Sequence, residues 1–189
     1  MINSLRIDAD PDTVYAFMLD VNRVVQCLPG AQLSKVVDPN TFEGQIKIKV
    51  GPITVAYNGL ARITDRDDAN RSAKLSGEGR ETTGSGSARA TVLMSVKQVD
   101  SSSEVTLVTD LNVAGRVAQF GRGIMEDVSR RLVADMAGRM KAQLEAGPEG
   151  ADHSPQDEGA GSVNAVSLLG GVVKDRIMRR FGGQEDKQQ

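Results

Sequence analysis

The chain has few of the residues on which enzymes and nucleic-acid-binding proteins commonly depend. Tryptophan is absent and aromatic residues make up 3% of the 189 residues, which argues against aromatic platforms that stack on bases. The only histidine is His153 and the only cysteine is Cys27, so the usual zinc sites and histidine-dependent triads cannot be built. We therefore expect a protein that is not an enzyme and that holds no metal ion.

Long apolar runs are also missing. No stretch approaches the roughly 18 apolar residues of a membrane-spanning helix. Arg6, Asp8 and Asp10 interrupt the N-terminal segment, which argues against a signal peptide. A single cysteine excludes an internal disulfide and suits a reducing compartment. These features predict a cytoplasmic protein in which Cys27 is a small buried apolar residue.

The net charge is small, at −2, but it is unevenly distributed along the chain. Residues 147–162 contain four acidic and no basic residues, whereas residues 163–189 contain five basic and three acidic residues. Residues 1–146 are consequently neutral. A neutral body lacks the basic surface that binds a phosphate backbone, so nucleic acid is not an expected partner.

The N-terminal segment predicts one strand and two short helices. Ile2 to Ile7 is typical of a strand. Asp10 can cap a helix that has Pro11 at its first position, and a second helix covers about Val21 to Cys27. Leu28-Pro29-Gly30 then predicts a turn, because proline fixes φ and glycine accepts a positive φ.

From Gln32 onward apolar and polar residues alternate, which is the period of half-buried strands. Six further strands are expected, one beginning near Gln32 and the others at about residues 42–50, 53–63, 73–79, 88–96 and 105–113. Tight turns such as Gly51-Pro52 make neighbouring strands antiparallel.

A long helix is predicted from Gly115 to Leu144. Its apolar residues recur every three or four positions, at Val117, Phe120, Ile124, Val128, Leu132, Met136, Met140 and Leu144. A helix of about 30 residues spans roughly 45 Å, and a broad sheet or a partner helix is needed to cover its stripe. We therefore expect an α+β fold in which a curved, seven-stranded antiparallel sheet wraps around this helix.

Small residues stand on the apolar face of the predicted sheet, where a solid core carries large ones. They are Gly59, Ala61, Gly77, Gly79, Ala88 and Ala90. The start of the long helix is small too, at Gly115, Ala118, Gly121 and Gly123. Because interiors pack to near-crystal density, missing volume on both layers indicates either a very close approach or a cavity.

A cavity is favoured, because a strongly twisted sheet cannot follow a long helix along its whole length. An apolar cavity suits a hydrophobic small molecule. The residues expected to line it are Phe17, Leu28, Ile53, Val55, Tyr57, Val117, Phe120, Gly121, Ile124, Met125 and Val128. Tyr57 is the residue expected to hydrogen-bond the headgroup of the ligand.

The remaining polar features predict little chemistry. Three carboxylates without an evident partner are expected to be solvated: Asp20, Glu78 and Glu81. Arg116 and Arg122 could orient a headgroup near the start of the helix, but surface positions are the favoured interpretation. The glycines from Gly77 to Gly86 are similar to a dinucleotide-binding loop, yet a strand follows them in place of the required helix.

Several short motifs resemble those of one family when they are taken together and in order. They are Pro11-Asp12-Thr13-Val14-Tyr15, Cys27-Leu28-Pro29-Gly30, Val50-Gly51-Pro52-Ile53, Tyr57-Asn58-Gly59, Gly84-Ser85-Gly86-Ser87-Ala88 and Gly115-Arg116-Val117-Ala118-Gln119-Phe120-Gly121. Over about residues 1–145 the chain thereby resembles the G-subunit family of carbon monoxide dehydrogenase. This family belongs to the helix-grip superfamily of START-like lipid-binding and polyketide cyclase proteins.

The resemblance implies a curved antiparallel sheet that grips the C-terminal helix around an apolar cavity. It also implies association with a molybdenum-containing carbon monoxide dehydrogenase and recruitment of that enzyme to the membrane. Tyr15 stands where the family often has tryptophan, and Asn58 where glutamate is common. The second departure argues against transferring a carboxylate role to Asn58.

The C-terminal segment predicts a tethered helix. Residues 147–162 are rich in glycine, proline, serine and acids, as in a flexible linker, and residues 182–189 are expected to be disordered. Residues 163–181 have the pattern of a basic amphipathic helix that binds the membrane through Val166, Leu169, Val173, Lys174, Arg176, Ile177, Arg179, Arg180 and Phe181. A helix that docks on the dehydrogenase is the alternative interpretation.

These features lead to one principal hypothesis and two alternatives. The principal one is a non-enzymatic carrier of a respiratory quinone, menaquinone or ubiquinone, between the membrane and carbon monoxide dehydrogenase. It places the protein peripherally on the inner face of the cell membrane. The first alternative is a passive membrane-recruitment adaptor with a filled core. The second is an enzyme related to polyketide cyclases, which the missing histidines and paired carboxylates disfavour.

Overall fold

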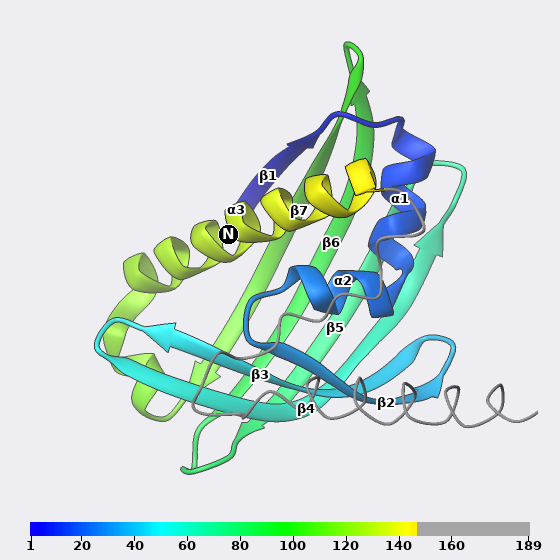
Figure 1. Ribbon diagram of the computed structural model, residues 1–189. Helices are drawn as coiled ribbons and strands as arrows, with labels where there is room; N and C mark the ends of the chain where they lie inside the picture. The colour runs from blue at the N-terminus through cyan, green and yellow to red at the C-terminus, as the bar shows by residue number, and fades with distance from the viewer. Residues whose placement is uncertain (147–189) are drawn as a thin grey trace, which may run out of the picture. The chain divides into compact units, whose positions relative to one another are not determined.

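The computed structural model describes residues 1–146, which form a curved antiparallel sheet with three helices packed on its inner face (Figure 1). The elements in chain order are β1 (Ile2–Ile7), α1 (Pro11–Leu19), α2 (Val21–Cys27), β2 (Ala31–Asp38), β3 (Thr41–Val50), β4 (Ile53–Asp67), β5 (Ser72–Glu81), β6 (Ser87–Val99), β7 (Ser102–Ala114), the 3₁₀ helix η1 (Arg116–Phe120) and α3 (Gly121–Ala146). The α+β prediction is confirmed, and the predicted linker and tail helix lie outside the described residues.

The strands follow the order β1-β7-β6-β5-β4-β3-β2, and every neighbouring pair is antiparallel. Hairpins connect β2 through β7 in sequence order, whereas β1 pairs with β7 and so brings the two ends of the sheet-forming segment together. A register shift between Ile63 and Asp65 interrupts the pairing of β4 with β5. Such shifts bend a strand and increase its twist, which helps the sheet to curve around α3.

Aspartate side chains begin both short helices. Asp10 precedes α1, and its carboxylate accepts a hydrogen bond from the backbone N–H of Thr13 at 2.9 Å, while Pro11 takes the first helical position. Asp20 does the same for α2 and accepts from Asn22 at 3.0 Å. The prediction for Asp10 is confirmed. Asp20 was expected to be a solvated carboxylate in a loop; it is half-buried, and its side chain caps α2.

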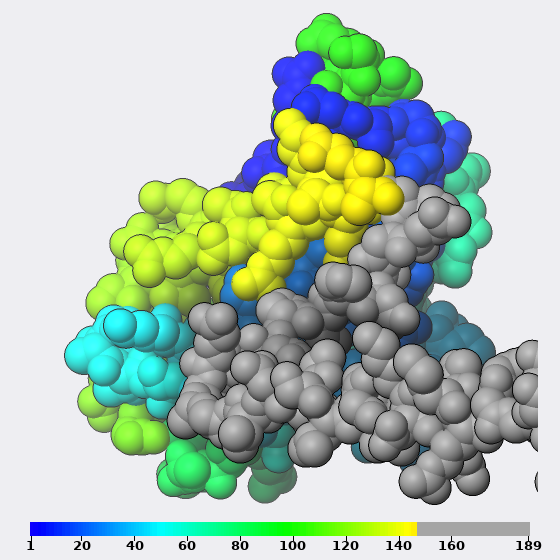
Figure 2. Space-filling view, viewed as in Figure 1, coloured from blue at the N-terminus to red at the C-terminus, as the bar shows by residue number. Residues whose placement is uncertain are grey.

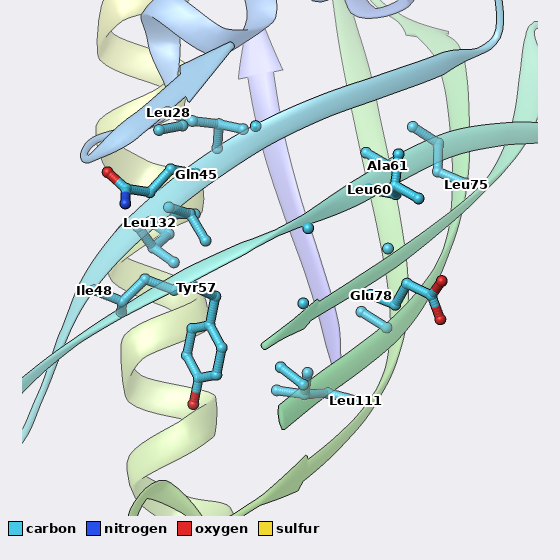
Figure 3. Close-up of a pocket in the computed structure, with 18 of the residues that line it drawn as sticks. Leu28, Gln45, Ile48, Tyr57, Leu60, Ala61, Leu75, Glu78, Leu111 and Leu132 are labelled. Carbon is cyan, nitrogen blue, oxygen red and sulfur yellow. The ribbon is translucent and has the colours of Figure 1, made fainter. Parts of the chain in front are cut away.

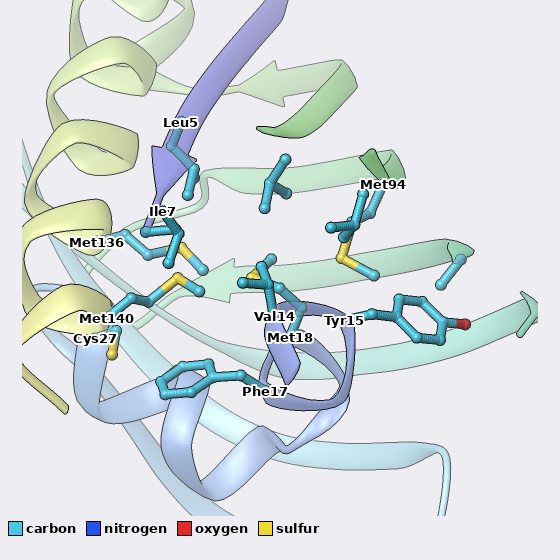
Figure 4. Packing of buried hydrophobic residues seen from close by; sticks show 13 residues of the cluster. Leu5, Ile7, Val14, Tyr15, Phe17, Met18, Cys27, Met94, Met136 and Met140 are labelled. Atoms are coloured by element: carbon cyan, nitrogen blue, oxygen red, sulfur yellow. The ribbon is translucent and has the colours of Figure 1, made fainter. Parts of the chain in front are cut away.

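One half of the interior is filled by large side chains, and we call it the filled core (Figure 4). Its buried members are Leu5, Ile7, Val14, Tyr15, Phe17, Met18, Cys27, Ala73, Met94, Val96, Val105, Met136 and Met140. They come from α1, α2, the C-terminal half of α3 and the facing strands. Cys27 is buried as predicted, and desolvation raises the pKa of its thiol, which keeps it protonated.

The long helix does not begin where the sequence pattern placed it. Residues 116–120 form a separate 3₁₀ turn, and α3 starts only at Gly121. Gly115 and Gly121 have φ values of +89° and +74°, which a right-handed helix does not accommodate. The apolar period continues across this break, because the 3₁₀ turn also points one residue in three to the same side.

Candidate functional site

A cavity of about 510 Å³ lies between the inner face of the sheet, α2 and the N-terminal half of α3 (Figure 3). The six small residues noted in the sequence, Gly59, Ala61, Gly77, Gly79, Ala88 and Ala90, all line it. Large apolar side chains complete the wall, among them Ile48, Leu75, Leu111 and Leu132. The missing volume therefore forms a cavity and not a close approach of the helix to the sheet.

The outer side chains of α3 form a ridge across one face of the molecule, coloured yellow-green to yellow in Figure 2. The two halves of α3 differ in what their inward side chains contact. Met136 and Met140 are buried in the filled core, whereas Met125, Val128 and Leu132 are only half-buried and line the cavity. The N-terminal half of α3 thus forms one wall of the cavity.

Six of the eleven predicted residues line the cavity, and these are Leu28, Val55, Tyr57, Val117, Met125 and Val128. The other five do not. Phe17 belongs to the filled core and is 2% exposed. Ile53, Phe120 and Ile124 pack beside the cavity, against a cluster formed by Val50, Val55, Tyr57 and Val117. Ligand binding by the six remains a prediction.

Gly121 was placed in the cavity because it was assigned to a continuous helix. It is exposed, and a Cβ atom added there would meet no atom within 4 Å. Glycine is needed here for its backbone conformation, because the positive φ of Gly121 ends the 3₁₀ turn at the start of α3. A larger residue at this position would consequently not close the cavity.

Sequence reasoning missed part of the wall that α2 and β7 contribute. Val21, Val24 and Val25 of α2 line the cavity, as do Leu111 and Val113 of β7. The two β7 residues pair with the small residues of β6, Leu111 with Ala90 and Val113 with Ala88. Cross-strand partners share one face of a sheet, so the hairpin register could have identified Leu111 and Val113.

Tyr57 supplies a polar group inside this apolar cavity. The residue is 6% exposed, and among the described residues its hydroxyl has no hydrogen-bond partner. Burial, followed by the negative charge of Glu81, raises the pKa of Tyr57, so the phenol stays protonated and can donate. A buried polar group without a partner is costly, and a ligand with an acceptor oxygen would satisfy it.

Glu81 lies beside Tyr57, because the two residues pair across β4 and β5. The Glu81 side chain is 1% exposed and forms an ion pair with Arg116 of η1, whose side chain is 58% exposed. The turn after β5 closes over this carboxylate. A Cβ atom at Gly84 would lie 2.8 Å from Glu81 Oε2, and one at Gly86 would lie 2.5 Å from it.

The ion pair overturns one expectation and extends another. Glu81 was predicted to be solvated, yet its carboxylate is buried; Arg116 is at the surface as predicted, but it binds Glu81 across 35 residues of sequence. The hairpin register and the turn at Gly115 bring them together, and neither leaves a local signature in the sequence. Glu78, by contrast, is largely exposed as predicted, and so is Arg122.

A curved antiparallel sheet that grips a long helix around an apolar cavity defines a protein of the helix-grip fold. The chain belongs to the CoxG family, the G-subunit family of carbon monoxide dehydrogenase, whose model matches residues 4–145. The family resemblance seen in the sequence is thereby confirmed. This is a family of accessory subunits of carbon monoxide dehydrogenase.

Solved structures support the fold. A conserved protein from Geobacillus kaustophilus is 18% identical with a TM-score of 0.68, and the alignment covers 77% of this chain and 94% of that one. The ZhuI aromatase/cyclase from Streptomyces sp. R1128 is 11% identical with a TM-score of 0.56, over 82% and 98% of the two chains. At these identities the similarity establishes the fold alone. No curated protein sequence matches this chain significantly.

The described residues contain no helix that is both long and apolar enough to cross a bilayer.

Proposed function

We propose that this protein is a non-enzymatic carrier that moves a respiratory quinone, menaquinone or ubiquinone, between the membrane and carbon monoxide dehydrogenase. The observation that carries the proposal is the apolar cavity with a buried phenol that has no partner among the described residues. A quinone has the matching chemistry, because its isoprenoid chain is apolar and its ring carries carbonyl acceptors. Membership of the CoxG family supplies the partner enzyme.

The two parts of such a ligand would be bound by different forces. Each buried CH₂ group contributes about 0.8 kcal/mol, so a few isoprene units in the cavity provide most of the affinity. The Tyr57 hydroxyl would donate a hydrogen bond to a ring carbonyl and contribute about 1 kcal/mol. Affinity therefore depends on cavity volume, and orientation depends on Tyr57.

Filling the cavity is the decisive test. Gly77 is suitable, because a Cβ atom there would meet only the Leu60 carbonyl oxygen, at 3.9 Å. Gly77→Phe should therefore fold, occupy the cavity, and abolish both menaquinone binding and electron transfer from the dehydrogenase to membrane quinone. Gly123→Phe is the matched control, since Gly123 is exposed with no atom within 4 Å of an added Cβ atom.

A passive recruitment adaptor predicts a different outcome. If folded Gly77→Phe supports electron transfer as well as the wild type, the cavity is not used and only recruitment remains. Native mass spectrometry of protein purified from its own host gives an independent check, since a carrier should retain quinone. Protein that arrives empty and takes up no added quinone would end the carrier proposal.

The membrane contact is assigned to residues 163–181, which lie outside the described residues, with residues 147–162 as the tether. Near an anionic leaflet, each of Lys174, Arg176, Arg179 and Arg180 should contribute about 1 kcal/mol. Such binding is reversible, as a carrier on the inner face of the cell membrane requires.

Deleting residues 163–189 should abolish sedimentation with anionic vesicles and leave quinone binding by residues 1–146 unchanged. Replacing the four basic residues with glutamine should weaken vesicle binding and flatten its salt dependence. If the full chain ignores vesicles but needs these residues to bind purified dehydrogenase, the segment is a partner-docking helix.

A further inference from the structure

The two charges of the Glu81–Arg116 pair face different surroundings. The carboxylate side chain is 1% exposed, whereas the guanidinium side chain is 58% exposed. Water screens a charge that it can reach and leaves a buried one effective over a longer distance. The pair is therefore neutral in sum but leaves a net negative field on its interior side, where Tyr57 lies.

The causes that raise the pKa of Tyr57 follow the same asymmetry. Glu81 raises the pKa of the phenol more strongly than Arg116 lowers it, and only desolvation has a larger effect. The hydroxyl is thus a neutral donor in a negative field. A neutral acceptor can approach such a donor, whereas an anion meets the carboxylate of Glu81 behind it.

The described lining offers little positive charge to an anionic headgroup. Among the described lining residues, Arg62 has the only cationic side chain, and its Nε donates to Thr41 Oγ1 at 3.1 Å. The N-terminal ammonium of Met1 donates to the Thr109 carbonyl oxygen at 2.7 Å. A ligand carboxylate drawn into the cavity would lose its hydration, and the exposed Arg62 is the only cationic side chain of the described lining that could compensate for this loss.

We infer that Glu81 determines the ligand class of this cavity, because it admits amphiphiles with a neutral carbonyl headgroup and excludes those with a carboxylate, such as free fatty acids. The inference rests on the proposed carrier function. It also explains why a carboxylate is buried beside a ligand cavity and balanced by a cation on the solvent side. A carrier that works at a bilayer must reject the fatty acids present there.

Oleate and methyl oleate are matched probes, since they share one chain and differ in headgroup charge. Each probe is allowed to compete with a short-tailed menaquinone for the protein, at a pH at which oleate is ionised. The menaquinone that stays bound after size-exclusion chromatography then gives the relative affinities of oleate and methyl oleate. The wild type should prefer the ester by roughly tenfold. Glu81→Gln should bring this ratio close to one, and Arg116→Gln should widen it, because the carboxylate then acts alone.

Two controls separate the role of Glu81 from general effects of charge and of the hydroxyl. Glu104→Gln removes an exposed glutamate of β7 that does not line the cavity, and it should leave the ratio unchanged. Tyr57→Phe should weaken menaquinone and methyl oleate about fivefold without restoring oleate. If Glu81→Gln does not fold, Arg116→Gln decides, since its side chain is largely solvated.

The outcomes are distinct. Wild-type protein that binds oleate as tightly as methyl oleate overturns the inference and leaves the carrier function standing. The same holds if Arg116→Gln narrows the preference, or if Glu104→Gln alters it as much as Glu81→Gln does. Protein that binds none of the three probes contradicts the carrier function itself.

Discussion

The two halves of the interior are built on the same strands and the same helix, yet one is solid and the other hollow. Along β5 and β6 the inward pairs change from Ala73 with Met94 in the filled core to Gly77 with Ala90 at the cavity. Along α3, Met136 is 3% exposed, whereas Met125 is half-buried. Side-chain volume on the sheet decides which half is filled.

A domain that contains such a cavity must draw its stability from the rest of its interior. A well-packed interior gains dispersion and hydrophobic energy at every contact, and a cavity forfeits part of both. The filled core, held by α1, α2 and the C-terminal half of α3, can stabilise the fold independently of the ligand. A ligand can then enter and leave the cavity without unfolding the domain.

Two methionines of α3 test this division most strongly. Met140→Ala should lower the free energy of unfolding by about 2–5 kcal/mol, because it leaves a cavity in a packed core. Met125→Ala should cost less than about 1 kcal/mol, because its side chain already faces open space. Urea unfolding measures both. Equal losses would mean that the two halves are packed alike.

Ligand binding should stabilise the half of the interior that contains the cavity, and so bring it closer in stability to the filled core. Menaquinone at about 100 times its dissociation constant should add about 2.7 kcal/mol to the free energy of unfolding. Hydrogen exchange should slow mainly in the N-terminal half of α3, in α2 and in η1, since these cover the cavity. Added protection confined to the C-terminal half of α3 would place the ligand elsewhere.

The Tyr57 hydroxyl should have opposite effects on stability and on binding. Tyr57→Phe removes a buried donor that has no partner among the described residues, so the empty protein should become more stable by about 1 kcal/mol. Tyr15→Phe is the control in the filled core, where the hydroxyl donates to Asp68 at 2.9 Å. That variant should lose stability. Thermal unfolding of both variants without ligand checks the contrast.

The smallest effect is expected at alkaline pH. The folded-state pKa of Tyr57 lies above the ordinary value of 10.0, because of burial and the charge of Glu81. The folded protein therefore holds the phenolic proton where the unfolded chain releases it. The resulting contribution is complete below that ordinary value and is lost as the pH rises through the folded-state pKa. The free energy of unfolding of the wild type, minus that of Tyr57→Phe, should fall as the pH is raised across this range. Urea unfolding at a series of alkaline pH values measures this difference.

Local sequence patterns placed the strands, the two short helices and the hollow region, and they misplaced only the start of the long helix. Period-two alternation marked the strands, Asp10-Pro11 marked the start of α1, and Leu28-Pro29-Gly30 marked the turn after α2. Each of these signals involves residues only a few positions apart, so it can be read directly from the sequence. The small residues from Gly59 to Ala90 also indicated missing volume, because alternation alone assigns them to the inner face.

Which side chains lie together follows from the way distant segments pack. Phe17 lies on a helix face that suits either interior, and the docking of α1 puts it in the filled core. Gly121 continues the helical period, yet its positive φ separates η1 from α3. Glu81 and Arg116 look solvated in isolation, and pairing of distant strands buries the carboxylate beside Tyr57. The placing of Phe17 and the burial of Glu81 depend on contacts between segments far apart in the chain, which local pattern does not encode.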